Sequence, residues 1–130
     1  MNARVKKMWI DALRSGEYTQ GKRQLIIVSP NADTNFCCLG VLCDLHHKAG
    51  QTGRWNGEDY ITPDAEDGTD FYTGSMPPPS VRKWLGIKVP RGSWDLPFED
   101  RDGDFPSLAE LNDDWNFTFS QIADLIEHVM

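Results

Sequence analysis

The 130-residue chain contains 39% hydrophobic and 25% charged residues, which is the composition of a globular domain and not of a disordered segment. Its length predicts one domain, residues 1–130, with one hydrophobic core. Acidic residues outnumber basic ones by 20 to 13, and the net charge of −7 argues against direct, nonspecific nucleic-acid binding. No apolar run approaches the ~20 residues that span a bilayer, and residues 1–16 are amphipathic and not a signal peptide, so we expect a cytoplasmic protein without a membrane segment.

The charge is unevenly distributed along the chain. Residues 1–23 carry six bases and two acids, a net charge of +4, whereas residues 24–130 carry seven bases and eighteen acids, a net charge of −11. The acids are densest in residues 58–70, which hold six acids and no base, and in residues 95–114, which hold eight acids and one base. A solvated surface accounts for this pattern, and it also permits a basic protein partner.

The N-terminal third predicts an amphipathic helix, a loop and a strand. Apolar residues at helical spacing favour a helix over residues 3–15, ended by Gly16. Residues 17–23 show no periodic pattern and are expected to be a loop. The β-branched run in residues 24–29 predicts a buried strand, closed by Pro30.

The densest apolar run of the chain, from Phe36 to Ala49 (FCCLGVLCDLHHKA), predicts a buried central helix. An acceptor side chain, Thr34 or Asn35, precedes this run and Gly50 follows it, and these are helix start and stop signals. One stripe of the helix is expected to face the core: Cys38, Val41, Leu42, Leu45 and Ala49. We expect the other elements to be organised around this Cys-rich helix.

The middle of the chain alternates glycines with aromatic residues and has no helical period. Residues 50–76 therefore predict short strands and turns. Residues 79–85 follow a run of prolines and predict a short helix, ended by Gly86. The side chains of this helix expected to point inward are Val81, Trp84 and Leu85.

Residues 87–106 predict a further irregular β region. Its Asp102-Gly103 pair favours a hairpin turn, because glycine takes the positive φ that such turns require. The acidic residues of this turn lack the ligands of a calcium-binding loop, since Phe98 and Ala109 stand where the pattern requires Asp and Glu. A solvated hairpin tip is therefore the stronger interpretation.

The C-terminal residues carry two capping-box patterns. Ser107-x-x-Glu110 and Thr118-x-x-Gln121 each pair a side chain with an otherwise unsatisfied backbone N–H at a helix start. Phe117 and Ile122 occupy the positions of a hydrophobic staple around the second box. The buried stripe expected for the final helix consists of Phe119, Ile122, Ala123, Ile126 and Val129, with Leu125 at its border.

Together these elements predict an α+β fold: a single compact domain with amphipathic helices at both ends, a buried central Cys-rich helix and a small antiparallel β region. Five segments, W-x-x-ALRSGEYTQG, FCCLGVLCDL, PPPSVRKWLG, SLAELND and FSQIADLIE, resemble a group of small proteins from bacteriophages, prophages and actinobacteria. The resemblance covers most of the chain in the same order. It implies a phage-related, intracellular accessory role and assigns no catalytic residue.

The three cysteines are clustered and odd in number, which fits a reducing compartment better than a disulfide framework. Cys37 and Cys38 fall in the predicted first helical turn, where free N–H groups and the helix dipole stabilise a thiolate. This placement resembles that of the nucleophile in papain-like hydrolases. However, His46 and His47 lie roughly 12 Å farther along the same helix, and His128 is on the exposed side of the last helix. An unreactive, buried cysteine pair is therefore favoured over catalysis.

A metal site is a further possibility within the central helix. Cys43 and His47 are spaced i, i+4, and Cys38 lies little more than one turn earlier, so three potential ligands are close. Structural zinc usually takes ligand pairs from two separated segments, and the sequence contains no second Cys/His pair. We therefore predict no metal and no cofactor.

A small-molecule or nucleotide pocket is suggested by aromatic and basic residues in the middle of the chain. Aromatic planes beside guanidinium groups suit stacked bases and phosphates. No phosphate-loop or dinucleotide motif is present, and packing in the core explains many of these aromatics. The candidate ligand-binding residues, expected between the central helix and the β region, are Arg54, Trp55, Tyr60, Tyr72, Arg82, Trp84, Arg91 and Trp94.

These observations favour a non-enzymatic accessory protein that acts by binding. Its partner would be a host protein or a small nucleotide-like signal, with interference in a host process as the consequence. One alternative is a cysteine-dependent hydrolase or transferase that uses Cys37 or Cys38. Another is a structural protein whose exposed aromatics form a homo-oligomer interface.

Overall fold

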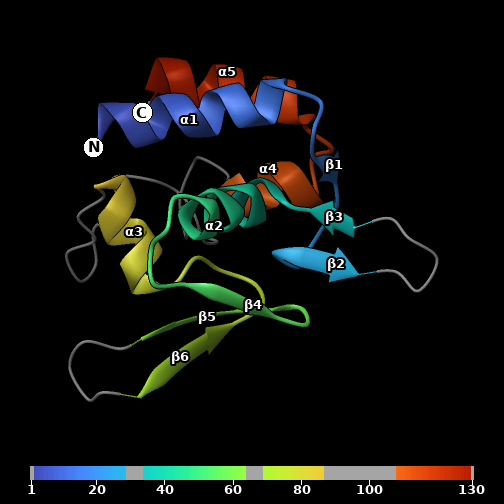
Figure 1. Cartoon of the computed structure of the whole chain (residues 1–130). Coiled ribbons are helices and arrows are strands. Elements are labelled where there is room, and N and C mark those ends of the chain that lie inside the picture. Colours follow the sequence, from blue (N-terminus) through green and yellow to red (C-terminus); the bar gives the residue numbers. More distant parts are fainter. Residues whose placement is uncertain (1, 29–33, 64–68, 87–107, 130) are drawn as a thin grey trace, which may run out of the picture.

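A central helix separates a pair of packed terminal helices from a small three-stranded sheet (Figure 1). The computed structural model describes residues 2–28, 34–63, 69–86 and 108–129. The first half of the chain contains α1 (Ala3–Arg14), β1 (Thr19–Gln20), β2 (Ile26–Val28), β3 (Thr34–Phe36) and α2 (Cys38–Lys48). The second half contains β4 (Arg54–Asn56), β5 (Asp59–Pro63), β6 (Asp70–Thr73), α3 (Pro79–Leu85), α4 (Leu108–Asp113) and α5 (Phe119–Val129). The fold class is α+β, as predicted.

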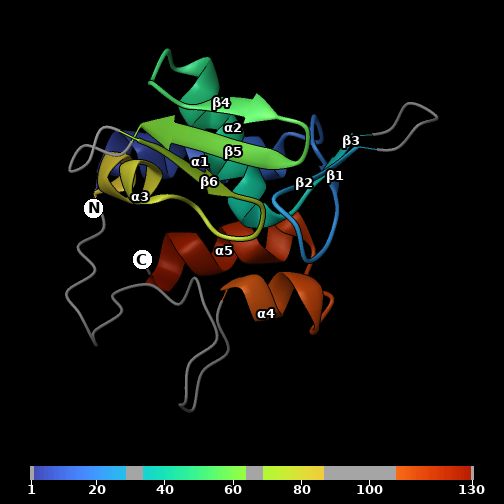
Figure 2. The same cartoon turned by 90° about the horizontal axis from the view of Figure 1, so that it is seen from below.

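The strands form two separate sheets. In the first, with order β1-β3-β2, the β1–β3 pair is parallel and the β2–β3 pair antiparallel. The second sheet, with order β4-β5-β6, is entirely antiparallel. Seen from below, the second sheet lies in front of α2 (Figure 2). The expectation of a small antiparallel β region thus holds for the second sheet, and the first sheet is mixed.

Helix α2 forms the centre of the core. Eight of its residues are buried, on all sides of the helix: Cys38, Leu39, Gly40, Val41, Leu42, Cys43, Asp44 and His46. The backbone before β2 lies directly on this helix, because a Cβ atom added to Gly40 would lie 1.7 Å from the Leu25 carbonyl oxygen. The prediction that only one side of this helix faces the core was therefore wrong, because more of the helix surface is buried than one stripe. The last member of the predicted stripe, Ala49, is exposed, and Leu45 is only half-buried.

The start of α2 differs from the prediction. Thr34 and Asn35 belong to β3, and the N-cap is Cys37, whose Sγ accepts a hydrogen bond from the Gly40 N–H at 3.4 Å. Phe36 pairs with Ile26 and Gln20 in the sheet. Strand pairing on both sides of β3 therefore overrides the capping preference of its polar residues.

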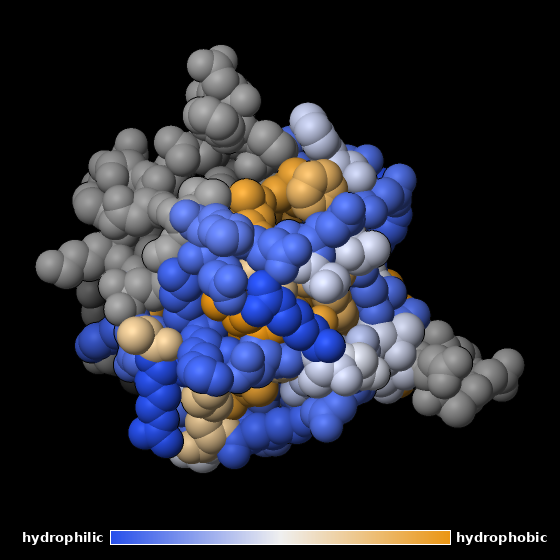
Figure 3. Space-filling view, turned by 90° about the horizontal axis from the view of Figure 1, so that it is seen from above, coloured by the Kyte–Doolittle hydropathy of each residue, from blue (hydrophilic) through white to orange (hydrophobic). Residues whose placement is uncertain are grey.

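Terminal helices α1 and α5 pack side by side (Figure 1). The N-cap of α1 is Asn2, whose side-chain oxygen accepts hydrogen bonds from the Arg4 and Val5 N–H groups. Arg14 joins α1 to α5 through ion pairs with Asp124 and Glu127. Viewed from the side of these two helices, the described surface is mostly hydrophilic, with hydrophobic residues visible between the polar ones (Figure 3).

The second of the two capping boxes predicted in the C-terminal residues is confirmed. The Thr118 hydroxyl accepts from the Gln121 N–H at 3.1 Å, and the Gln121 side-chain oxygen accepts from the Thr118 N–H at 2.9 Å. Helix α3 has the predicted bounds, and Gly86 ends it with a φ of 81°. Ser107, the irregular region 87–106 and the Asp102–Gly103 turn lie outside the described residues.

One expectation for the N-terminal third was wrong, and another is confirmed only in part. The segment expected to be a loop contains the short strand β1, which pairs with β3. The strand expected over residues 24–29 is described from Ile26 to Val28 and is not buried throughout, because Val28 is 52% exposed at its end. Leu25 is fully buried but precedes the strand.

Candidate functional site

The sheet β4–β6 divides the predicted ligand-binding residues between its two faces. Arg54 and Tyr72 lie opposite Ile61 in one cross-strand row, whereas Trp55 lies opposite Tyr60 in the next row. Adjacent rows point to opposite faces of a sheet. Tyr60 belongs to the core and is fully buried, while Tyr72 is 57% exposed. The predicted pocket is therefore not assembled as one site by these four residues.

The inner face of the sheet packs against α2 through rings. The Tyr60 ring lies between Trp55, at a centroid distance of 4.7 Å, and His46, at 5.7 Å. The His46 ring also contacts the Trp84 ring at 5.3 Å. Gly53 is required beside this group, because a Cβ atom there would lie 2.0 Å from the Tyr60 hydroxyl. Three of the predicted ligand-binding aromatics thus serve packing between the sheet, α2 and α3.

Tyr60 and His46 form a buried hydrogen bond, with 2.6 Å between the hydroxyl and Nδ1. Burial lowers the pKa of His46 to about 4. Burial also raises the pKa of Tyr60 above its usual value. At neutral pH both groups are therefore uncharged, and the tyrosine hydroxyl can donate to the imidazole. The pair suits a fixed structural contact better than proton transfer, because neither pKa lies near 7.

A second polar cluster surrounds Asp44 on the side of α2 next to β4. Its carboxylate accepts hydrogen bonds from the Tyr18 hydroxyl at 2.6 Å and from the Trp55 indole N–H at 3.0 Å. Lys48 lies 3.2 Å from the same carboxylate and 4.9 Å above the Tyr18 ring centroid. Burial, followed by the bond to Asp44, raises the pKa of Tyr18. This cluster holds the loop before β1, helix α2 and strand β4 together.

The outer strand β6 has a different character. Two adjacent aromatic side chains, Phe71 at 39% and Tyr72 at 57%, are exposed on opposite faces of it. Arg54 reaches across from β4 and forms an ion pair of 2.9 Å with Asp70. Figure 1 shows β6 at the lower rim of the molecule, on the far side of β5 from β4. We define the β6 edge as the side of Asp70–Thr73 that faces away from β5.

The remaining predicted ligand-binding residues do not join the β6 edge. The Arg82 Nε donates a hydrogen bond to the Pro77 carbonyl at 3.0 Å, which places this guanidinium at the start of α3. Trp84 is half-buried against His46. Arg91 and Trp94 lie outside the described residues.

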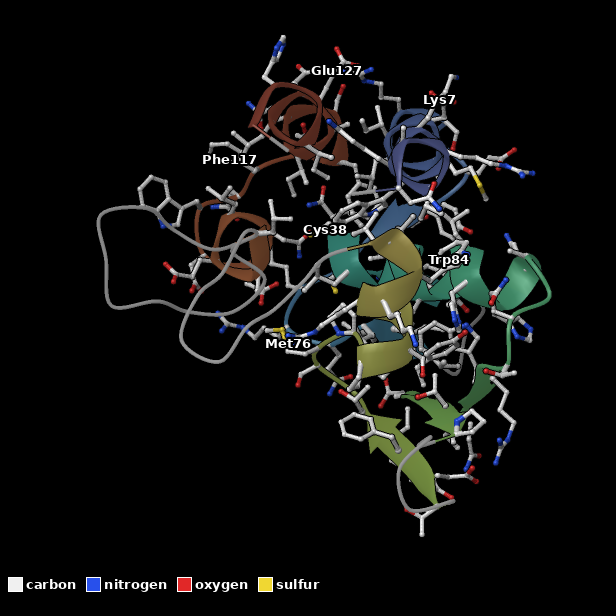
Figure 4. All side chains as sticks on the ribbon, turned by 90° about the vertical axis from the view of Figure 1, so that its left-hand side faces the viewer. Lys7, Cys38, Met76, Trp84, Phe117 and Glu127 are labelled. Atoms are coloured by element: carbon white, nitrogen blue, oxygen red, sulfur yellow. The ribbon has the colours of Figure 1, made fainter. Side chains whose placement is uncertain are left out.

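The cysteines are buried and unpaired. Cys37 is 5% exposed, and Cys38 and Cys43 are fully buried; Figure 4 shows Cys38 in the interior, whereas Lys7 and Glu127 lie on the outer sides of α1 and α5. Burial raises the pKa of Cys37 to about 11 and those of Cys38 and Cys43 well above their usual value. Desolvation therefore outweighs the stabilisation that a helix N-terminus gives a thiolate.

The three candidate metal ligands do not converge on one site, because each has a different environment. Cys38 lies 3.8 Å from the Leu108 carbonyl, and the Nδ1 of His47 lies 3.0 Å from the Gly53 carbonyl. Cys43 is buried in the apolar core. Within the described part of the chain, no group of three or more His, Cys, Asp or Glu side chains is placed to hold a metal ion.

Sequence reasoning missed the Asp44 cluster and gave no weight to Phe71. The i, i+4 spacing of Asp44 and Lys48 is a visible signal of a helical ion pair. Nothing in the sequence shows that Tyr18, 26 positions earlier, bonds to the same carboxylate. Phe71 is one of several aromatic residues in the middle of the chain, and only the strand order reveals that it lies on an edge strand.

The structure thus defines a small α+β domain with polar and aromatic contacts in its interior and exposed aromatic side chains on an edge strand. The chain belongs to the family DUF8296, a domain of unknown function, whose family model matches residues 1–130. No curated protein and no solved structure matches the chain. Among the described residues, no helix is both long and apolar enough to cross a membrane.

Proposed function

We propose that this protein is a phage- or prophage-type accessory protein that acts in the host cytoplasm by binding a host protein, and thereby interferes with a host process. The observation that carries the proposal is the exposure of Phe71 and Tyr72 on the outer strand β6. Exposed aromatic side chains are enriched at protein–protein interfaces, where they supply much of the binding energy. The resemblance of five sequence segments to phage and prophage proteins supports the biological setting.

A protein partner is favoured over a nucleotide-like ligand. Nucleotide binding requires aromatic and basic side chains that converge on one pocket. Here Tyr60 is buried behind the sheet, Tyr72 is on its opposite face, and the Arg54 guanidinium pairs with Asp70. Strand β6 instead presents an open surface, which suits a macromolecular partner.

Binding is also favoured over cysteine catalysis. A thiol nucleophile requires access to substrate and a pKa near or below the working pH. Cys37 and Cys38 are buried and their pKa values are raised. His46, the buried histidine of the same helix, is hydrogen-bonded to Tyr60.

The proposal is tested by capture from a lysate of the bacterium that carries the gene. The immobilised full-length protein is compared with a Phe71→Ser/Tyr72→Ser variant, which removes both exposed rings of β6. Trp115→Ser is the matched control, because Trp115 is also 57% exposed but follows α4. We expect one protein to be retained by the wild type and the control and to be lost from the β6 variant.

If all three proteins retain the same lysate protein equally, β6 is not part of the binding surface. No retained protein, together with a stable dimer mass by light scattering, would favour the homo-oligomer alternative. In that case the Phe71→Ser/Tyr72→Ser variant should be monomeric if the same two rings form the dimer contact.

A further inference from the structure

We infer that the β6 edge takes up an extended, basic segment of the partner as an additional antiparallel or parallel strand. The inference rests on the proposed function, because it specifies which surface binds and what chemistry it recognises. Strand addition of this kind obtains affinity from main-chain hydrogen bonds and selectivity from alternate side chains.

The β6 edge presents unpaired backbone groups. Gly57 and Glu58 form a two-residue turn with a φ of 62° at Gly57, which makes Asn56 and Asp59 the hydrogen-bonded pair that closes the hairpin. Alternation along β5 then directs the N–H and C=O groups of Tyr60 and Thr62 toward β6. Their partners are Thr73 and Phe71.

By the same alternation, the backbone groups of Asp70 and Tyr72 point to the β6 edge. Within the described part of the chain, no backbone hydrogen bond occupies these groups of either residue. The other sheet contrasts with this arrangement. At its edge strand β2, the Val28 N–H donates to the Glu58 carboxylate. The N–H of Leu25, which precedes β2, donates to the carbonyl of Gly74, which follows β6, so the open part of the β6 edge ends at Thr73. An incoming strand therefore finds donors and acceptors at β6.

Side chains on both faces of β6 can contact an added strand. Phe71 and Tyr72 point to opposite faces, and both are exposed. An added strand would place its own alternating side chains beside these two rings, at the spacing of neighbouring strands. An apolar residue on each face would cover aromatic surface that now contacts water.

The charge around β6 selects a basic partner. The segment 58–70 contains six acids and no base, and its described acids Glu58, Asp59 and Asp70 are exposed. Arg54 forms an ion pair with Asp70, whereas Glu58 and Asp59 form no ion pair with a described residue. Pairing of β6 with a second copy of this chain would bring together two chains that each carry a net charge of −7, and like charges across an interface are unfavourable. A Lys- or Arg-containing strand is the complementary occupant.

The test uses the full-length protein and three labelled peptides of about six residues, a common strand length. The first alternates lysine and valine, the second alternates glutamate and valine, and the third is the lysine peptide with alternate backbone nitrogens methylated. The third peptide keeps the charge but cannot complete a strand pairing. Binding is measured by fluorescence anisotropy at low and physiological salt.

We expect the lysine peptide to bind, and the glutamate and methylated peptides to bind at least about tenfold more weakly. Tyr72→Pro should weaken binding of the lysine peptide by a similar factor. Proline at this position removes an N–H that points to the β6 edge and leaves the hydrogen bonds to β5 in place. Tyr72→Ala is the matched variant that removes the ring and keeps the N–H. Equal binding of the methylated peptide would overturn strand addition, and this arm does not depend on any variant folding.

The two proposals fail in different ways. If the wild-type protein and Tyr72→Pro retain the same partner from the lysate, strand addition is wrong while partner binding stands. If the lysine peptide binds through β6 and no lysate protein is retained, the β6 edge can accept an added strand but the proposed host partner is not supported. Binding of a second copy at the edge would appear as a dimer that Tyr72→Pro abolishes, and it would overturn the basic partner.

Discussion

Gly40 illustrates how a single missing side chain fixes the distance between two parts of the core. The Leu25 backbone lies against the helix at this position, and the Leu25 carbonyl accepts a hydrogen bond from the Cys37 N–H at 3.2 Å. The same contact brings the strand β2 next to the first turn of α2. A glycine in a helix usually costs stability relative to alanine, so its presence here indicates that close approach outweighs helix propensity.

Gly40→Ala is therefore expected to destabilise the protein, although the same change in an ordinary helix stabilises it by about 1 kcal/mol. The added Cβ would overlap the Leu25 carbonyl, and relieving this clash requires a backbone shift that costs about 2 kcal/mol. Urea denaturation of the two proteins measures the difference in the free energy of unfolding. An equal or higher midpoint for the variant would contradict the close contact.

His46 predicts a dependence of stability on pH. Its pKa is about 4 in the folded state against 6.5 as the ordinary value, so the unfolded chain binds an extra proton between these values. Stability from this residue is fully present above pH 6.5 and is lost as the pH falls toward 4, by up to about 3 kcal/mol. Below pH 4 both states are protonated at this position and the loss levels off.

The measurement is the urea midpoint of the wild type and of His46→Gln between pH 7.5 and 4. Glutamine retains a polar group for the Tyr60 hydroxyl but does not titrate in this range. We expect the difference between the two proteins to shrink, or change sign, as the pH falls. A constant difference across the range would show that His46 does not carry the pH dependence.

At the scale of elements, the sequence allowed the helices to be predicted better than the strands. The bounds of α3 and the cap of α5 depend on local rules, namely proline at a helix start, glycine at its end and a reciprocal side-chain cap. Strand β1 consists of two residues and is held by β3, which follows it by fourteen positions or more. Such a short strand has no periodicity of its own, so only the tertiary structure specifies it.

The candidate site was harder to predict for a related reason. Arg54 and Trp55 are neighbours in sequence, yet their side chains lie on opposite faces of the sheet. The composition of this segment suggested that both side chains line one pocket, whereas the strand register directs them to opposite faces. Register depends on the pairing of β4 with β5 and of β5 with β6, which the spacing of glycines and aromatics did not determine.

The capping box of α5 provides a prediction at the element scale. Thr118→Ala removes the hydroxyl that accepts from the Gln121 N–H, and we expect a loss of about 1 kcal/mol in the free energy of unfolding. Ser120→Ala is the control, because Ser120 is exposed in the same turn and should change stability by less than about 0.5 kcal/mol. Equal effects of the two substitutions in chemical denaturation would show that the cap is dispensable.

At the scale of the whole molecule, the buried thiols predict how the protein reacts with alkylating and disulfide-exchange reagents. The chain has three cysteines, all free and buried with raised pKa values. In native buffer we expect thiol labelling at least about a hundredfold slower than in urea, because labelling then requires opening of the core. A thiol that reacts quickly in the native protein would instead support the cysteine-dependent enzyme.

The packing of α1 against α5 has a consequence for synthesis on the ribosome. Buried residues of α1, among them Trp9 and Leu13, belong to the same core as Ile122 and Ile126 of α5. The packing of α1 is thus complete only after α5 has been made. Until α5 leaves the ribosome, the part of α1 that faces α5 lacks its native cover, whereas α2 and α3 contact other parts of α1. A nascent chain of this protein should therefore bind a chaperone for hydrophobic segments early, and be released from it when α5 docks.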